Sequence, residues 1–287
     1  MAREYVRPAA VAGSWYPGTA AALTREVDRY LSAATGTPAG DVLGIVSPHA
    51  GIMYSGPVAA YAYHALRGRA YDVAVLIGPS HYDAFDGVAV AHHDAFETPL
   101  GLIPVDRDLC SALAAASPLI HPRPSAHVRE HSLEMQLPFL KRVLPDTPIV
   151  PLVMGFQSRE TIVAVADALA RTLRGRQALL VASTDLSHYF DGRTAGKLDG
   201  RVVDYVNRFD VDGLLDEFEQ YPEHERGRRV ACGGGPALAM LRAARALGAS
   251  QARVLRYANS GDISGDYSAV VGYLAAAVGS FESGLPA

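Results

Sequence analysis

Three histidines follow apolar runs of the sequence. His49, His81 and His188 each lie within a few residues of the end of such a run. The runs predict buried strands, and the carboxyl ends of parallel strands line the crevice where α/β proteins bind ligands. Neutral imidazole is the commonest metal ligand and the usual acid or base near neutral pH. The recurrence predicts a shared site, whereas any one of these histidines alone would more readily cap a loop.

Cys232 is a fourth candidate, because Cys232-Gly233-Gly234-Gly235-Pro236 directly precedes a helical pattern. The positive end of a helix dipole is expected to lower the pKa of a nearby thiol and to favour the metal-binding thiolate. The glycines match neither of the phosphate-binding patterns GxGxxG and GxxxxGK[ST]. The alternative for Cys232 is a buried small residue, which is the role assigned to Cys110 in its apolar run.

The segment His127-Val128-Arg129-Glu130-His131 matches H-x-x-E-H, in which two histidines on one helical face bind zinc. Two prolines precede it and Ser132 resembles a helix N-cap directly after it, so we expect the motif to lie in a loop. A zinc peptidase is therefore a minor alternative. Glu130, His131 and Glu134 remain candidates for lining a pocket, although Glu134 could simply favour the first turn of a helix.

Trp15 is the only tryptophan and lies among turn-forming residues. Its ring could face a substrate or cover the core, and core packing is the default interpretation. The sequence contains no GxSxG elbow, so a serine hydrolase has no support.

The composition excludes several classes of protein. With 49% hydrophobic and 20% charged residues the chain is typical of a globular protein, and its net charge of −4 provides no global positive field for nucleic acid or an anionic membrane. The apolar run 270–278 is too short for a membrane-spanning helix. Two cysteines and a charged N-terminus without a signal-peptide pattern predict a cytoplasmic protein without a disulfide framework.

Apolar runs alternate with helical patterns, which predicts an α/β protein whose mostly parallel or mixed central sheet has helices on both faces. No composition shift marks a boundary, so residues 1–287 are expected to form a single domain. The expected strands span 42–47, 71–78, 87–91, 147–154, 177–183, 253–259 and 268–274. The expected helices span 56–66, 106–116, 132–143 (strained or kinked at Pro138), 159–174, 193–207, 211–219 and 236–247.

The sequence resembles the Memo family over nearly its whole length. The matching segments are, in order, Ala12-Gly13-Ser14-Trp15-Tyr16-Pro17, Ser47-Pro48-His49-Ala50-Gly51 with Tyr54-Ser55-Gly56, Gly78-Pro79-Ser80-His81, Glu130-His131-Ser132-Leu133-Glu134-Met135-Gln136-Leu137-Pro138, Ser183-Thr184-Asp185-Leu186-Ser187-His188-Tyr189, Cys232-Gly233 and Asn259-Ser260-Gly261-Asp262. This resemblance implies one α/β domain related to the class III extradiol dioxygenases, which are non-haem iron enzymes that open catechol rings.

The resemblance also implies a metal triad of His49, His81 and Cys232, with Asp185 and His188 as catalytic partners. The expected metal is Fe(II), as in the dioxygenases. Copper and then zinc are alternatives, because a thiolate is softer than the carboxylate of the dioxygenases, and it can itself be oxidised. We therefore do not extend the catechol cleavage of the dioxygenases to this chain. Further pocket or substrate-binding residues are expected at Trp15, Tyr54, His131 and Glu134.

Three hypotheses follow from these residues. The first is a metal-dependent oxidoreductase in which His188 exchanges protons and Asp185 orients its neighbours. The second is a binding module that keeps the dioxygenase-like fold and holds a small molecule, a peptide or a partner protein in the crevice. The third is a zinc hydrolase. The resemblance further implies a functional association with a radical-SAM protein, and links animal relatives to phosphotyrosine-peptide binding.

Overall fold

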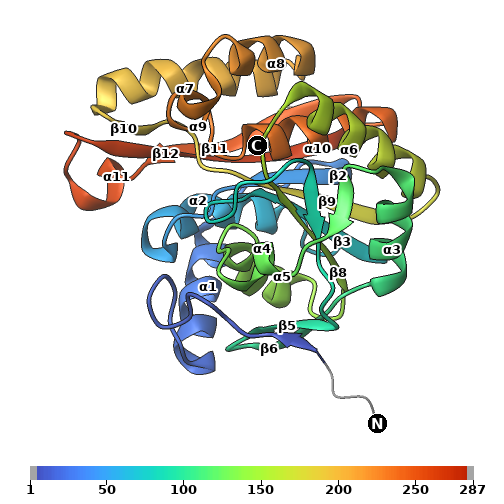
Figure 1. The fold of residues 1–287 in the computed structure, drawn as a ribbon. Helices are drawn as coiled ribbons and strands as arrows, with labels where there is room; N and C mark the ends of the chain where they lie inside the picture. Colours follow the sequence, from blue (N-terminus) through green and yellow to red (C-terminus); the bar gives the residue numbers. More distant parts are fainter. Residues whose placement is uncertain (1–4, 283–287) are drawn as a thin grey trace.

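A mixed nine-stranded sheet forms the centre of the structure, a computed structural model that describes residues 5–282 (Figure 1). Its strands follow one another in the order β10 (His188–Phe190), β12 (Val270–Phe281), β2 (Gly40–Ser47), β9 (Ala178–Ser183), β3 (Val73–Pro79), β8 (Ile149–Met154), β4 (Val88–Val90) and β7 (Ile120–Pro122), while β11 (Gln251–Asn259) pairs with β12. A separate small sheet contains β1 (Val6–Arg7), β5 (Ala95–Thr98) and β6 (Gly101–Pro104).

The middle of the large sheet is parallel. Strands β2, β9, β3 and β8 pair in parallel, whereas β12 is antiparallel to its neighbours β2, β10 and β11, and β4 is antiparallel to β8. The central strands β3, β8 and β9 are buried along their whole length, which is why they read as continuous apolar runs. The predicted mixed α/β sheet is confirmed.

Helices cover both faces of this sheet (Figure 1). The first face carries α1 (Ala20–Ala33), α2 (Ile52–His64) and α5 (Leu137–Val143). The opposite face carries α3 (Arg107–Ala116), α6 (Arg159–Thr172), α7 (Gly192–Asn207), α8 (Val211–Glu219) and α10 (Gly234–Ala246), and α9 (Glu223–Arg229) packs between α8 and β10. The remaining short helices are α4 (Ser125–Val128), the 3₁₀ turn η1 (Glu134–Gln136) and α11 (Gly261–Ser264).

Most expected elements occur within a few residues of their predicted bounds, but β12 extends to Phe281, well beyond the predicted end at residue 274. Helix α2 begins at Ile52, four residues before the predicted start, because Gly51 is its N-cap and the Ile52 amide donates to Trp15 O at 2.9 Å. The strain expected at Pro138 is absent: η1 ends at Gln136, so Pro138 lies in the first turn of α5, where its missing N–H breaks no helical bond. Among residues 5–282, no helix is both long and apolar enough to cross a membrane.

Candidate metal centre

Strand order brings the candidate residues to one edge of the sheet. His49 follows β2, His81 follows β3, and Asp185 follows β9, which lies between these two strands and is parallel to both. The carboxyl ends of the three strands therefore meet, as the strand-end pattern of the sequence requires.

Three imidazoles gather at this edge. His49, His81 and His131 each offer one ring nitrogen, and the three nitrogens lie within 4.8 Å of one another. The His81 and His131 rings stack with centroids 4.3 Å apart, and His49 meets them edge-on at 5.2 Å and 5.7 Å. The group is a candidate metal-binding site.

Hydrogen bonds to Ser183 define the tautomer of His49. The Ser183 hydroxyl donates to the Ser132 carbonyl at 2.6 Å and accepts from Gln136 Nε2 at 2.8 Å. Its single proton is therefore used, so the 2.9 Å contact between His49 Nδ1 and Ser183 Oγ requires Nδ1 to carry a proton and donate. The lone pair of His49 Nε2 then faces the Cys232 sulfur, 3.3 Å away, where it can accept from the thiol or bind a metal.

Glu130 positions the proton of His81 in a similar way. Its Oε1 lies 2.8 Å from His81 Nδ1, and because a carboxylate only accepts, Nδ1 donates, so in the neutral ring the lone pair is on Nε2. Glu130 also accepts from the amides of His81 at 2.6 Å and Ser132 at 2.8 Å. Burial alone would raise the pKa of Glu130, but the hydrogen bonds and charge of His81 and the Ser132 amide lower it to about 2.

The electrostatics keep the buried imidazoles neutral. Burial, together with the neighbouring His81, lowers the pKa of His49 well below its usual value. Burial and the two other imidazoles lower the pKa of His131 to about 3. A neutral imidazole is the form that binds a metal.

Cys232 lies beside this group of donors but is not part of it, because the donor atoms within 4.8 Å of one another in residues 5–282 belong to His49, His81 and His131. Its Sγ lies 3.3 Å from His49 Nε2, which matches the roughly 3 to 3.6 Å expected between a sulfur and a nitrogen bound to one metal ion, given the usual bond lengths. The Cys232 amide donates to Asp185 O at 3.2 Å and the Gly233 amide to Thr184 Oγ1 at 2.9 Å, so the segment after β9 holds the cysteine in place.

The expected lowering of the Cys232 pKa by the helix dipole is wrong. Cys232 does precede α10, but burial and the nearby Asp185 carboxyl raise the pKa of its thiol. Without a metal the thiol keeps its proton, and a bound metal would have to displace that proton.

Asp185 and His188 lie in the same pocket. Asp185 Oδ1 accepts from the His49 amide at 2.8 Å, so the carboxyl anchors the loop that carries His49, and burial raises its pKa. His188 Nδ1 is 2.7 Å from Leu186 O, which can only accept, so His188 Nε2 is free to take a proton. Both residues line the pocket.

The pocket has a volume of about 470 Å³ and a mostly apolar lining. Trp15 lies at its wall with its ring 4.2 Å from that of His131. Tyr189, 68% exposed, also lines it and has a φ of 61°, a left-handed conformation that is uncommon for a tyrosine. The strained residue directly follows His188, at a register shift in β10.

A model of the family described as Memo-like protein matches residues 7–277. The chain belongs to the Memo-like family. It is 38% identical over 278 residues to a MEMO1 family protein of Methanothermobacter thermautotrophicus, covering 93% of this chain and 98% of the relative. It is 40% identical over 273 residues to a MEMO1 family protein of Methanosarcina mazei, covering 94% of this chain and 98% of the relative. A crystal structure of an uncharacterized Escherichia coli K12 protein aligns with a TM-score of 0.49 and 14% identity, over 82% of this chain and 99% of that one.

Two of the four expected pocket residues, Tyr54 and Glu134, do not line the pocket. Tyr54 lies on α2 and does not contribute to the wall. Glu134 is fully buried and was expected at the pocket, but it instead binds the Arg7 guanidinium, accepts from Tyr16 Oη at 2.6 Å and from the Ala10 amide at 2.8 Å. It anchors the N-terminal segment that carries Trp15.

The H-x-x-E-H segment does not form a peptidase site. Helix α4 ends at Val128, so His127 and His131 do not share a helical face. His127 is 1% exposed and packs beside His93 and Phe96, with ring centroids about 6 Å away. The sequence pattern points to Glu130 and His131 but not to their partners. Glu130 binds His81, and His131 stacks on His81 and contacts Trp15, and these partners lie in other segments of the chain.

Proposed function

We propose that this Memo-like protein is a metal-dependent oxidoreductase whose metal is held by His49, His81 and Cys232. The observation that carries the proposal is the hydrogen bonding of the imidazoles. Partners that can only accept, or have no proton left to donate, place a proton on Nδ1 of both rings, so that Nε2 carries the lone pair in each neutral ring, and His49 Nε2 lies 3.3 Å from the Cys232 sulfur. A site built only for packing does not need two fixed tautomers.

The donor set suits a transition metal such as iron, copper or zinc. Imidazole with thiolate suits Fe, Cu and Zn, and hard-ion chemistry with Mg²⁺ or Ca²⁺ is disfavoured. A bound iron or copper ion would supply one-electron chemistry to a substrate or to dioxygen. The resident metal expected from the resemblance is Fe(II), with copper as the second candidate.

The side chains of the pocket prepare a substrate for that chemistry. His188 Nε2 can accept a proton from a bound hydroxyl or return it, because its Nδ1 is committed to Leu186 O. Asp185 keeps the His49 loop in place through the His49 amide. Trp15 covers His131 and offers an apolar surface against which a flat ligand can stack.

Metal analysis of protein purified without oxygen tests the proposal. We expect the wild type to retain about one equivalent of Fe or Cu, and the double variant Cys232→Ser/His49→Ala to lose it. Cys110→Ala is the matched control, since Cys110 is a buried cysteine of α3 outside the pocket. Equally low Fe, Cu and Zn in the wild type and the double variant would contradict the proposal.

Two single variants identify the third donor. If the thiolate binds, Cys232→Ser abolishes retention of the metal, and His131→Ala retains it with weaker ligand binding. The reverse result would assign the metal to the three imidazoles that lie within 4.8 Å of one another.

A binding function without catalysis is the second candidate, favoured by the exposed Tyr189 and by Trp15 at the pocket wall. In that case a small-molecule or peptide ligand binds equally well after chelation and in the Cys232→Ala variant. Loss of binding on chelation would contradict this alternative.

A further inference from the structure

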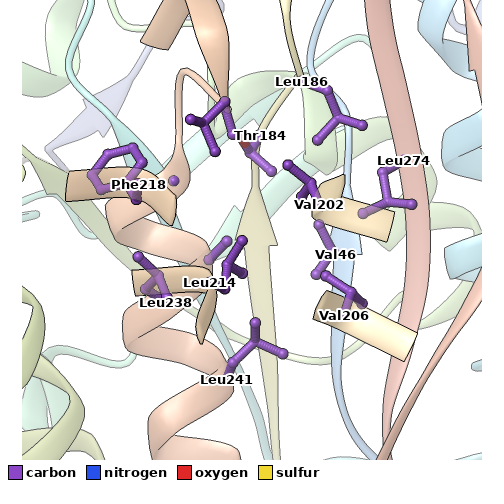
Figure 2. A pocket seen from close by; sticks show the side chains of 14 residues that line it. Val46, Thr184, Leu186, Val202, Val206, Leu214, Phe218, Leu238, Leu241 and Leu274 are labelled. Carbon is purple, nitrogen blue, oxygen red and sulfur yellow. The ribbon is translucent and has the colours of Figure 1, made fainter. Parts of the chain in front are cut away.

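A second, enclosed cavity lies between the sheet and the helices of one face. Figure 2 shows apolar side chains from β2, β12 and three helices pointing into one space. The helical contributors that matter below are Val202 and Val206 of α7, Leu214 and Phe218 of α8, and Leu238 and Leu241 of α10. The cavity has a volume of about 20 Å³. A single water molecule needs roughly 10 to 15 Å³ by the same measure.

The side chains of this cavity offer a water molecule at most one hydrogen bond. Among its lining residues, all of which the structure describes, Thr184 has the only polar side chain. Thr184 Oγ1 donates to Asp185 O at 2.8 Å and accepts from the Gly233 amide at 2.9 Å, so its one proton is used and a single acceptor site remains. A buried water needs two to four polar partners, and apolar cavities without them stay dry and take up apolar ligands such as xenon.

The cavity adjoins the candidate metal centre. Thr184, which lines the cavity, directly precedes Asp185, which lines the metal pocket. Ala231 lines the cavity in the same way and directly precedes Cys232. The same two segments thus form a wall of both spaces, and the Cys232 amide bonded to Asp185 O joins them.

We propose that this cavity binds dioxygen, a small uncharged molecule that prefers an apolar space to water, and holds it beside the metal centre. Its apolar lining, its volume and its shared wall with the pocket carry the inference. The use of the stored gas rests on the proposed oxidoreductase function, whereas the binding of an apolar gas does not.

Xenon is the probe. Crystals of the full chain pressurised with xenon are expected to show a xenon peak between Val206, Leu214 and Leu241. Val206→Ile adds one methylene group to the cavity and is expected to reduce the occupancy at least several-fold, whereas Val206→Ala enlarges the cavity and is expected to raise it. Val165→Ile makes the same change in α6, at a buried position outside the cavity, and should leave the xenon peak unchanged.

Oxygen dependence is the second readout. In Val206→Ile, the dioxygen concentration that gives half-maximal turnover is expected to rise several-fold at unchanged metal content. An ordered water in the cavity, or an active protein without a xenon peak, would overturn the inference. A xenon peak in a metal-loaded protein that consumes no dioxygen would support gas binding and contradict the use of the gas at the metal centre, whereas the proposed function itself fails on metal content, so the two failures are distinguishable.

Discussion

Glu130 accepts three hydrogen bonds, from the ring and amide of His81 and from the amide of Ser132. Through these bonds it fixes both the tautomer of the His81 ring and the loop that carries His131. Carboxylates that orient a metal-binding histidine in this way are often nearly as important for affinity as the ligands themselves.

Glu130→Gln is expected to weaken metal binding about 10- to 100-fold, because the amide cannot accept at every position where the carboxylate does. Competition with a chromophoric chelator measures this change. Glu160→Gln on α6 is the control, since Glu160 is exposed and does not line the pocket. An unchanged affinity for Glu130→Gln would show that His81 does not need this carboxylate.

A second prediction concerns Glu134, which is buried together with Arg7. Removing one partner of a buried ion pair leaves the other charge uncompensated, so Glu134→Ala is expected to cost about 3 to 5 kcal/mol of unfolding free energy. Urea denaturation of metal-free protein measures it. The control Arg107→Ala breaks an exposed pair with Asp94 and should cost at most about 1 kcal/mol. Equal losses in the two variants would contradict the anchoring role of Glu134.

At the scale of elements, close contact between the end of β9 and the start of α10 positions Cys232. Gly233 is the N-cap of α10, and a Cβ atom added there would lie 2.3 Å from Ser183 O. Only a residue without a side chain allows the two backbones to approach this closely.

Gly233→Ala should therefore push the segment of Cys232 away from β9. We expect a loss of about 1 to 3 kcal/mol of stability together with loss of the bound metal, measured by denaturation and metal analysis. Gly196→Ala on α7 is the matched control: nothing lies within 4 Å of its added Cβ, so it should gain about 0.5 to 1 kcal/mol. Retention of stability and metal in Gly233→Ala would contradict this contact.

At the scale of the whole molecule, buried neutral histidines couple folding to pH. Burial, with help from His93 and Arg7, lowers the pKa of His127 to about 3, and the pKa of His131 is lowered to about 3 as well. An unfolded histidine titrates near 6.5. Between these values the unfolded chain binds protons that the folded protein does not, so stability present above pH 6.5 is lost as the pH falls to 3.

The metal-free protein is therefore expected to lose stability steadily below pH 6.5, by up to about 1.4 kcal/mol per pH unit for each such histidine. Glu130, with a pKa lowered to about 2, extends this loss below pH 4. Urea denaturation at a series of pH values measures the slope, which His127→Phe should reduce and His224→Gln, at an exposed position, should not. A flat stability between pH 6.5 and 4 would contradict the prediction.

The sequence by itself determined the mixed α/β fold and the positions of His49 and His81 at strand ends, whereas His188, expected there too, is the first residue of β10. Apolar runs of four to eight residues are local signals, and the carboxyl ends of parallel strands meet at one edge in any such sheet. The local pattern also located most helices. It predicted strain at Pro138 because it did not reveal that a new helix begins at Leu137, which places Pro138 in a first turn.

Only the tertiary structure decided what the polar residues contact. Glu130 is 49 residues from His81, and Glu134 is more than 100 residues from Arg7 and Tyr16. The tautomers of His49 and His81, the burial that raises the pKa of Cys232 and the apolar cavity behind the pocket all depend on such distant partners. Hydrogen bonding and desolvation act over a few ångströms of space, and separation along the chain carries no information about them.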